Sequence, residues 1–156
     1  MPSPQEVDIV VKLALAAVLG GLVGLEREHD KRPAGLRTNM LICIGAALFG
    51  SIGLAYFKDT GDISRIWQNI ITGVGFLGAG AVIKDEHTIH GLTTAAGIWA
   101  VAGVGLAIAA GFYFLALTAE AIILITLLLL RRFEHHLSPV PPDPSPREDP
   151  KGSALP

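Results

Sequence analysis

The residues best suited to chemistry in this sequence gather in one polar segment between two apolar stretches. Residues 26–39 read Glu-Arg-Glu-His-Asp-Lys-Arg-Pro-Ala-Gly-Leu-Arg-Thr-Asn. Glu26, Glu28 and Asp30 carry the hard carboxylate oxygens that Mg²⁺ accepts as ligands. Cationic side chains stand among these acids and would neutralise such a site, so we expect internal ion pairs in preference to a metal centre. Mg²⁺ stays a candidate ligand, but the sequence identifies no set of residues that would coordinate it.

The second half of this segment predicts a turn followed by a helix. Pro33 and Gly35 are turn-forming residues, and the next apolar run begins shortly after them. Arg32, Arg37 and Thr38 are then expected at the level of the lipid headgroups, and Asn39 follows them directly. Attraction to anionic lipid is a sufficient explanation for the arginines.

A second polar segment precedes the longest apolar run. His87 and His90 lack a cysteine or carboxylate partner at the spacing of a zinc site, so they are weak evidence for zinc. Thr93 or Thr94 is expected to serve as the N-cap of the helix that follows.

Glu120 is the acid placed deepest in an apolar stretch. It stands about eight residues past the turn expected at Gly111, which is about 12 Å of helix and close to the middle of a bilayer. Acids at that depth usually face the interior of a helix bundle and have a partner. Two alternatives remain open: an ion pair with Lys12, or a protonated carboxyl that hydrogen-bonds to a neighbouring helix.

The composition shows which elements must position these residues. Of the 156 residues, 51% are hydrophobic and only 17% are charged, with a mean hydropathy of +0.52. Residues 41–57, 66–83 and 92–119 contain no Asp, Glu, Lys or Arg. A soluble domain of this size could not bury three such stretches, so a soluble enzyme and a disordered protein are both excluded. The net charge of −2 offers no field for binding nucleic acid.

The apolar runs predict an all-α membrane protein with five transmembrane helices, because each span needs about 20 apolar residues. The expected spans are residues 7–25, 41–57, 66–83, 92–110 and 112–130 of a single domain, residues 1–137. The loops on one side would carry seven Lys and Arg residues and those on the other side two. The positive-inside rule then places the N-terminus outside and the C-terminus in the cytoplasm. Residues 138–156 hold seven of the ten prolines and are expected to form a disordered tail.

Glycine makes up 18 of the 156 residues and concentrates in the apolar runs. Residues 73–80 read Gly-Val-Gly-Phe-Leu-Gly-Ala-Gly, which matches a dinucleotide-binding pattern literally. That interpretation needs a preceding strand and an acid about 20 residues on, and both are missing, so we reject it. We expect Gly73, Gly75, Gly78 and Gly80 to let helices pack closely through small-residue seams. A broken or re-entrant helix that lines an ion site is the alternative.

No nucleophile, base and orienting residue occur together on any predicted face, so we do not expect an enzyme. The spans contain no histidine and a single serine, Ser51. The chain also lacks the phosphate-binding loop of an ATP-driven pump.

Four linked motifs resemble the MgtC/SapB family of bacterial inner-membrane proteins. They cover most of the chain, from about residue 7 to residue 132. The matching segments are Gly24-x-Glu26-Arg27-Glu28, Arg32-Pro33-Ala34-Gly35-Leu36-Arg37-Thr38-Asn39 with Gly45-Ala46-Ala47-Leu48-Phe49, Gly73-x-Gly75-Phe76-Leu77-Gly78-Ala79-Gly80, and Gly91-Leu92-Thr93-Thr94-Ala95-Ala96-x-x-Trp99. Glu120 is outside the resemblance, and residues 138–156 stand where many members carry a soluble regulatory domain.

The resemblance implies a protein tied to magnesium limitation and, in pathogens, to survival inside macrophages. It also implies that the protein regulates other membrane machinery, such as the proton-translocating ATP synthase, although many members are described as Mg²⁺ transporters. We therefore expect a non-enzymatic, multi-pass inner-membrane protein that needs no cofactor. Its expected partners are the lipid bilayer and other membrane proteins or further copies of itself. Transport of Mg²⁺ or another ion is the alternative function.

Overall fold

The computed structural model describes residues 2–57, 63–84 and 88–137, with side chains up to residue 129. The predicted tail, residues 138–156, lies outside the described residues. Five helices form the fold: α1 Pro4–His29, α2 Leu36–Phe57, α3 Ile63–Gly80, α4 Leu92–Ala109 and α5 Tyr113–Leu137. Two short antiparallel strands, β1 Ile83–Lys84 and β2 Ile89–His90, stand between α3 and α4. The prediction of an all-helical fold with five helices is confirmed, and the β1–β2 pair was not predicted.

Helix α1 is longer at both ends than the apolar run from which it was predicted. Ser3 and Glu6 form a capping box at its start, in which the Ser3 hydroxyl accepts from the Glu6 backbone N–H at 3.2 Å. At the other end the helix continues through the charged residues Glu26–His29. The loop expected between the first two spans, residues 26–40, is therefore shorter than predicted, since residues 26–29 belong to α1 and residues 36–40 to α2. The hydropathy boundary of a helix is not its hydrogen-bonding boundary.

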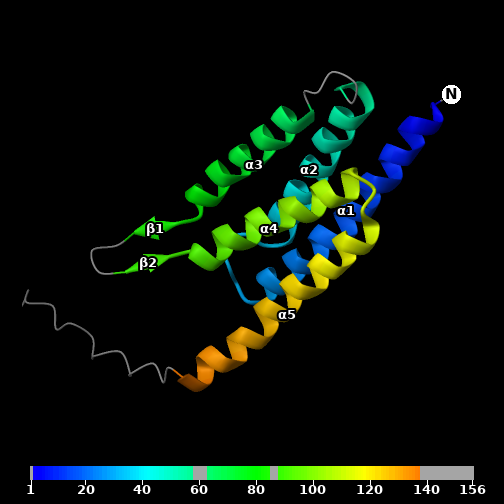
Figure 1. Ribbon diagram of the computed structural model, residues 1–156. Helices are drawn as coiled ribbons and strands as arrows, with labels where there is room; N and C mark the ends of the chain where they lie inside the picture. The colour runs from blue at the N-terminus through cyan, green and yellow to red at the C-terminus, as the bar shows by residue number, and fades with distance from the viewer. Residues whose placement is uncertain (1, 58–62, 85–87, 138–156) are drawn as a thin grey trace, which may run out of the picture.

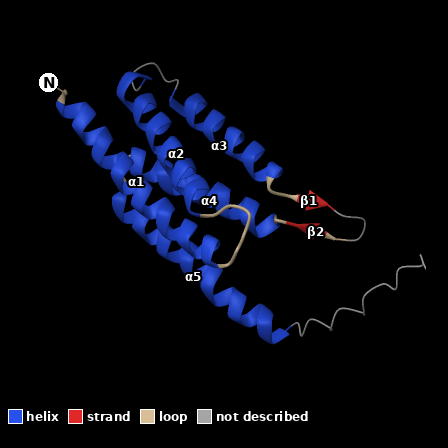
Figure 2. Ribbon diagram, turned by 180° about the vertical axis from the view of Figure 1, so that it is seen from behind, coloured by secondary structure: helices blue, strands red, loops and turns tan. Residues whose placement is uncertain are grey.

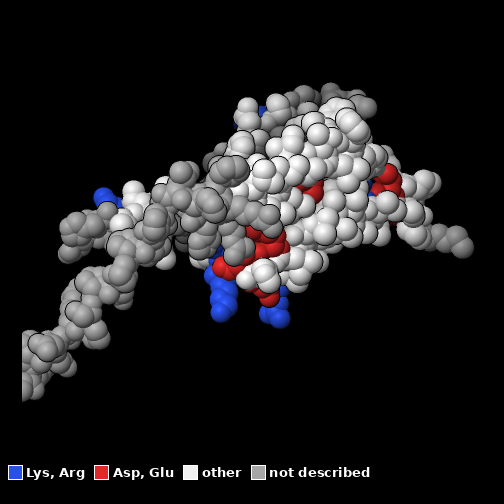
Figure 3. All heavy atoms as spheres, turned by 90° about the horizontal axis from the view of Figure 1, so that it is seen from below, with Lys and Arg blue, Asp and Glu red and all other residues white. Residues whose placement is uncertain are grey.

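Three of the helices, α1, α2 and α4, are long and apolar enough to cross a membrane. In α5, the part Tyr113–Leu129 forms a shorter apolar stretch. Large apolar side chains also stand exposed on the outer surface, including Phe76 at 80% and Phe114 at 85% exposure. Charged atoms gather in a few groups on the face seen in Figure 3, and most of the described surface there is uncharged. A surface of this kind suits a lipid environment.

Helix α4 occupies the centre of the bundle, since it packs against all four of the other helices. Helix α3 lies at one side against α2 and α4, and α5 lies at the other side against α4 and α1 (Figures 1 and 2). The largest buried cluster joins α1, α2, α4 and α5 through residues such as Val23, Cys43, Val104 and Ala116.

Glycines mark the closest approaches between helices. A Cβ at Gly24 of α1 would lie 2.6 Å from the Cα of Leu36, and one at Gly20 would lie 2.6 Å from the Cβ of Cys43. In the same way Gly105 of α4 faces the Cys43 carbonyl oxygen of α2. Gly111 has a φ of +79°, in the left-handed region, and forms the predicted turn between α4 and α5.

Candidate functional site

One end of the bundle holds almost all of the polar motif residues, and we call it the motif end. Here α1 and α3 end, α2 and α4 begin, and α5 ends (Figure 1). The fold thus brings residues 26–39 next to residues 91–94, which stand more than 50 positions further along the chain.

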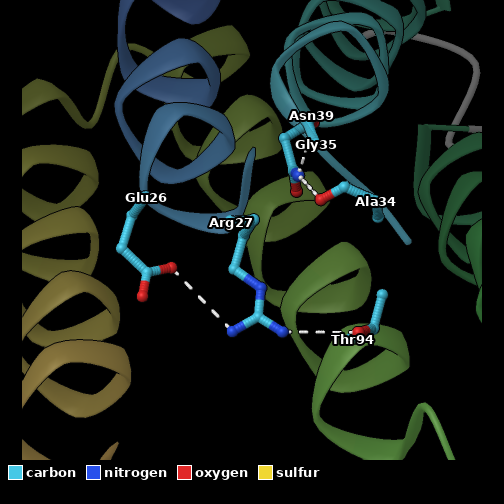
Figure 4. Close-up of polar contacts among 6 residues, drawn as sticks. All are labelled: Glu26, Arg27, Ala34, Gly35, Asn39 and Thr94. Carbon is cyan, nitrogen blue, oxygen red and sulfur yellow. Dashed lines mark hydrogen bonds and ion pairs between the residues drawn. The ribbon is translucent and has the colours of Figure 1, made fainter. Parts of the chain in front are cut away.

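A buried hydrogen bond connects these two segments directly. Arg27 projects from the last turns of α1, and its Nη2 donates to Thr94 Oγ1 of α4 at 3.3 Å (Figure 4). Both residues are buried, with exposures of 7% and 4%. The Arg27 Nη1 also lies 3.8 Å from Glu26 Oε2, which compensates part of the guanidinium charge. This ion pair is of the kind predicted for the segment.

Glu28 connects the end of α1 to the start of α2. Its Oε2 accepts a hydrogen bond from the Leu36 backbone N–H at 2.8 Å, and so satisfies one of the free amides of the first turn of α2. Gly35 lies against the same carboxylate, since a Cβ there would be 3.0 Å from Glu28 Oε2. A glycine therefore leaves room for this contact.

Asn39 fixes the turn between α1 and α2 from inside. The residue is 1% exposed, and its Nδ2 donates to the carbonyl oxygens of Ala34 at 2.9 Å and Gly35 at 3.0 Å (Figure 4). The first bond pairs the Ala34 carbonyl, and the second adds to the bond that the Gly35 carbonyl accepts from the Asn39 backbone N–H at 3.2 Å.

Gly91, not a threonine, is the N-cap of α4. It has a φ of +85°, and a Cβ there would overlap the Ala81 carbonyl oxygen. The prediction that Thr93 or Thr94 caps this helix is wrong, because the helix already begins at Leu92. Thr94 instead lies within the first turn, where its side chain turns inward to Arg27.

Several motif residues remain at the surface of the motif end: Arg32, Pro33, Arg37, Thr38 and Thr93. Arg37 and Thr38 line a hollow of about 470 Å³ together with Pro33, the end of α3 and Ile98 of α4. Neither Arg37 nor Thr38 makes a side-chain hydrogen bond or ion pair with another described residue. The motif residues thus divide into a bonded set, Arg27, Glu28, Asn39 and Thr94, and an exposed set whose side chains make no such bond with other described residues.

The acids of residues 26–30 do not assemble into a metal site. Within the described residues, no three His, Cys, Asp or Glu side chains are grouped so that they could hold a metal ion. Glu26 is paired with Arg27, and Glu28 binds a backbone amide. His87 lies outside the described residues, and the His90 Nε2 lies 2.9 Å from the Thr88 hydroxyl.

The glycine-rich motif is part of an unbroken helix, which contradicts the broken-helix alternative. Gly78 does pack closely, as a Cβ there would lie 3.4 Å from the Ala95 carbonyl oxygen of α4. At Gly73, Gly75 and Gly80, however, a Cβ would find no atom within 4 Å. Close packing of this motif against another helix of the same chain is therefore found at Gly78 and not at these three positions. All three are exposed, and Gly73 and Gly80 line hollows beside α2, while Val74 and Gly78 are the buried residues of α3.

Glu120 is buried at 3% exposure, as its depth in the sequence suggested. Among the described residues neither of its two predicted partners is found, because both carboxylate oxygens lack a hydrogen bond there and Lys12 pairs with Asp8 at 2.8 Å. The Lys12–Asp8 pair is an i, i+4 contact along α1, in which the Lys12 side chain is 14% exposed and that of Asp8 56%.

A family model, that of the MgtC family, matches residues 13–136. The chain belongs to the MgtC family. Relatives include Escherichia coli K12 "Putative magnesium transporter YhiD", 40% identical over 84% of this chain and 62% of its own length. Protein MgtC of Salmonella typhimurium LT2 is 39% identical over 85% of this chain and 56% of its own. An uncharacterized Haemophilus influenzae protein is 36% identical over 87% of this chain and 62% of its own length.

The chain thus spans less than two thirds of the length of these MgtC-family relatives. No solved structure matches it.

The contact between Arg27 and Thr94 is a feature of this MgtC-family chain that the sequence did not indicate. Each residue was identified as part of a motif, but no local pattern relates two motifs that stand 67 residues apart. A second such feature is an apolar groove of about 540 Å³ between α2 and α3, lined by Leu41, Phe49, Asn69, Gly73 and seven further residues.

Proposed function

We propose that this MgtC-family chain is a non-enzymatic regulatory protein of the bacterial inner membrane that supports growth when Mg²⁺ is scarce. The names of its relatives, MgtC and a magnesium transporter candidate, support a role related to Mg²⁺. The observation that carries the regulatory part is the division of the motif end. Arg27 and Thr94 are bonded to each other in the interior, while Arg37 and Thr38 stand unpaired at the surface.

In this proposal five helices cross the bilayer, packed through small residues, with the motif end in the cytoplasm. The basic residues of the first loop, Lys84 and the pair Arg131-Arg132 all belong to segments at that end, and the positive-inside rule favours the cytoplasm for it. The close approaches at Gly20, Gly24 and Gly105 support packing through small residues.

The bonded set holds the motif end in one shape, and the exposed set acts on a partner. Arg27, Glu28 and Asn39 connect α1, α2 and α4, so the surface that carries Arg37 is held in place by three helices. An arginine offers up to five donors in a planar fork, which suits a carboxylate or phosphate group of another membrane component. Family resemblance makes the ATP synthase a candidate partner, and a further copy of this chain is another.

Replacing Arg37 with alanine tests the proposal. We expect growth at low Mg²⁺ to fall to that of a strain without the gene, while the amount of protein in the membrane stays the same, since Arg37 makes no bond that supports the fold. Lys84→Ala is the matched control, because Lys84 is an exposed cation on β1 outside the motif. Normal growth of the Arg37→Ala strain at low Mg²⁺ would contradict the proposal.

Ion transport is the second candidate, and Glu120 is the observation that favours it. A buried carboxyl without a partner could exchange a proton or bind a cation that moves through the bundle. Purified protein in liposomes under a Mg²⁺ gradient would show flux that Glu120→Gln abolishes if this candidate is right. Equal Mg²⁺ leak from protein-containing and empty liposomes would contradict the transport candidate.

A further inference from the structure

The hollow at Arg37 and the groove between α2 and α3 adjoin, and we call the two together the trough. Both are lined by Leu41, Ile42 and Leu77, so the two spaces meet at these residues. From this shared part, the groove continues along α2 to Phe49 and along α3 to Ile66, while the hollow reaches the motif end at Arg37.

The two ends of this trough differ sharply in chemistry. Arg37 is the one charged side chain among the described residues that line it, and the hydroxyl of Thr38 stands beside it. The part between α2 and α3 is lined by apolar side chains and glycines, with the amide of Asn69 as the polar exception. The trough therefore offers a positive, hydrogen-bonding mouth at one end and a long apolar surface behind it.

The length of the trough fits one leaflet of a bilayer. From Arg37 to Phe49 the α2 backbone rises about 18 Å, slightly more than half of the roughly 30 Å thickness of the hydrocarbon core. Arg37 stands in the first turn of α2, so it lies at the depth of phosphate groups when the helix spans the membrane.

Glycines keep the apolar part of the trough open. A Cβ at Gly45 of α2 or Gly73 of α3 would find no atom within 4 Å, so both positions face the empty space of the groove. This accounts for part of the glycine motif that packing within the chain leaves unexplained, since Gly73 belongs to that motif.

We propose that this trough binds one anionic phospholipid of the membrane, with its phosphate at Arg37 and Thr38 and an acyl chain between α2 and α3. Basic pockets between transmembrane helices on the cytoplasmic side are suited to anionic headgroups. The site rests on the membrane orientation proposed above, but it does not depend on the role in Mg²⁺-limited growth. A bound lipid would report the composition of the inner leaflet to the motif end, where Arg37 stands.

Native mass spectrometry of the purified full chain tests the site, with phosphatidylglycerol and phosphatidylcholine of identical acyl chains as probes. We expect one phosphatidylglycerol to be retained in preference to phosphatidylcholine. Arg37→Gln should lower phosphatidylglycerol retention about tenfold, the loss expected for one charge-assisted hydrogen bond, and leave phosphatidylcholine unchanged. Lys84→Gln, which removes an exposed cation outside the trough, should leave both unchanged.

Filling the groove gives an independent arm of the test. Gly45→Leu and Gly73→Leu should each lower the retention of both lipids, because the new side chain occupies the space of the acyl chain. Gly103→Leu is the matched control, since Gly103 of α4 is equally open but lies outside the trough. A variant whose helix content by circular dichroism departs from the wild type is set aside, and the other groove position decides.

Three outcomes would overturn the proposal. One is equal retention of the two lipids by the wild type, which would indicate ordinary surrounding lipid. Another is unchanged phosphatidylglycerol retention in both Arg37→Gln and the folded groove variants. The third is displacement of the lipid by glycerol phosphate at equal concentration, which would indicate an anion site without an acyl groove. Loss of low-Mg²⁺ growth is measured separately in cells, so a failure of the lipid site and a failure of the proposed function remain distinguishable.

Discussion

Arg27 shows how a single residue can link distant parts of this protein. A guanidinium at 7% exposure is costly to bury, and it is tolerated here because Thr94 accepts one hydrogen bond and Glu26 supplies a nearby negative charge. The carboxylate oxygens of Glu26 have no hydrogen bond of their own, so its contribution is electrostatic. The bond to Thr94 is thus the directional contact that sets how α1 meets α4.

Thr94→Val tests the value of this bond at the residue scale. Valine keeps the shape of the side chain but removes the acceptor, so the Arg27 guanidinium loses a buried partner. We expect the free energy of unfolding to fall by about 1 kcal/mol, the usual size for a side-chain hydrogen bond between membrane helices. The free energy of unfolding is measured by titrating the protein with a denaturing detergent. Thr94→Ser should restore the wild-type value, and Thr93→Val, at an exposed position, is the control. A Thr94→Val midpoint equal to that of Thr93→Val would contradict the prediction.

The helices fit together through a few glycines whose neighbours are backbone atoms. At Gly24 the nearest atoms are the Cα and carbonyl oxygen of Leu36, which cannot rotate away as a side chain would. The same contact positions Leu36 so that its amide reaches Glu28. The close approach of α1 to α2 and the capping of α2 are thus two results of one geometry.

Gly24→Ala tests this contact at the scale of the element. The new Cβ would lie 2.6 Å from the Leu36 Cα, so α1 and α2 must separate and the Glu28–Leu36 bond must lengthen. We expect the free energy of unfolding to fall by about 1–3 kcal/mol, as for other overpacked interiors. Gly103→Ala, at a position with open space, should leave stability unchanged or slightly raise it. Equal stability of the two variants would show that the α1–α2 contact is looser than described.

At the scale of the whole molecule, the fold places the polar motif residues at one end of the bundle and the apolar surface around its sides. The motif end carries the bonded residues Arg27, Asn39 and Thr94, with Arg37 exposed beside them. This polarity matters for the proposed function, which requires the residues that bind a partner to stand on the cytoplasmic side.

Cysteine labelling in intact cells tests that orientation. The one native cysteine, Cys43, is fully buried, so it should add little background to labelling by a membrane-impermeant maleimide. We expect Phe112→Cys to react in intact cells and Lys84→Cys to react only after the membrane is opened. Labelling of Lys84→Cys in intact cells would place the motif end outside and reverse the proposed orientation.

The sequence by itself determined the class of this protein, its five helices, the turn at Gly111 and the family, because apolar run length, glycine placement and motif spacing are local properties. It also indicated that Glu120 would be buried, from depth alone. Only the tertiary structure decided which residues meet. The Arg27–Thr94 bond, the Glu28 cap on α2 and the trough from Arg37 to Phe49 each depend on how helices distant in the chain are placed side by side. Glycine shows the difference most clearly: the sequence marks where a side chain is absent, and the fold decides whether the space is filled by backbone, as at Gly24, or left open, as at Gly73.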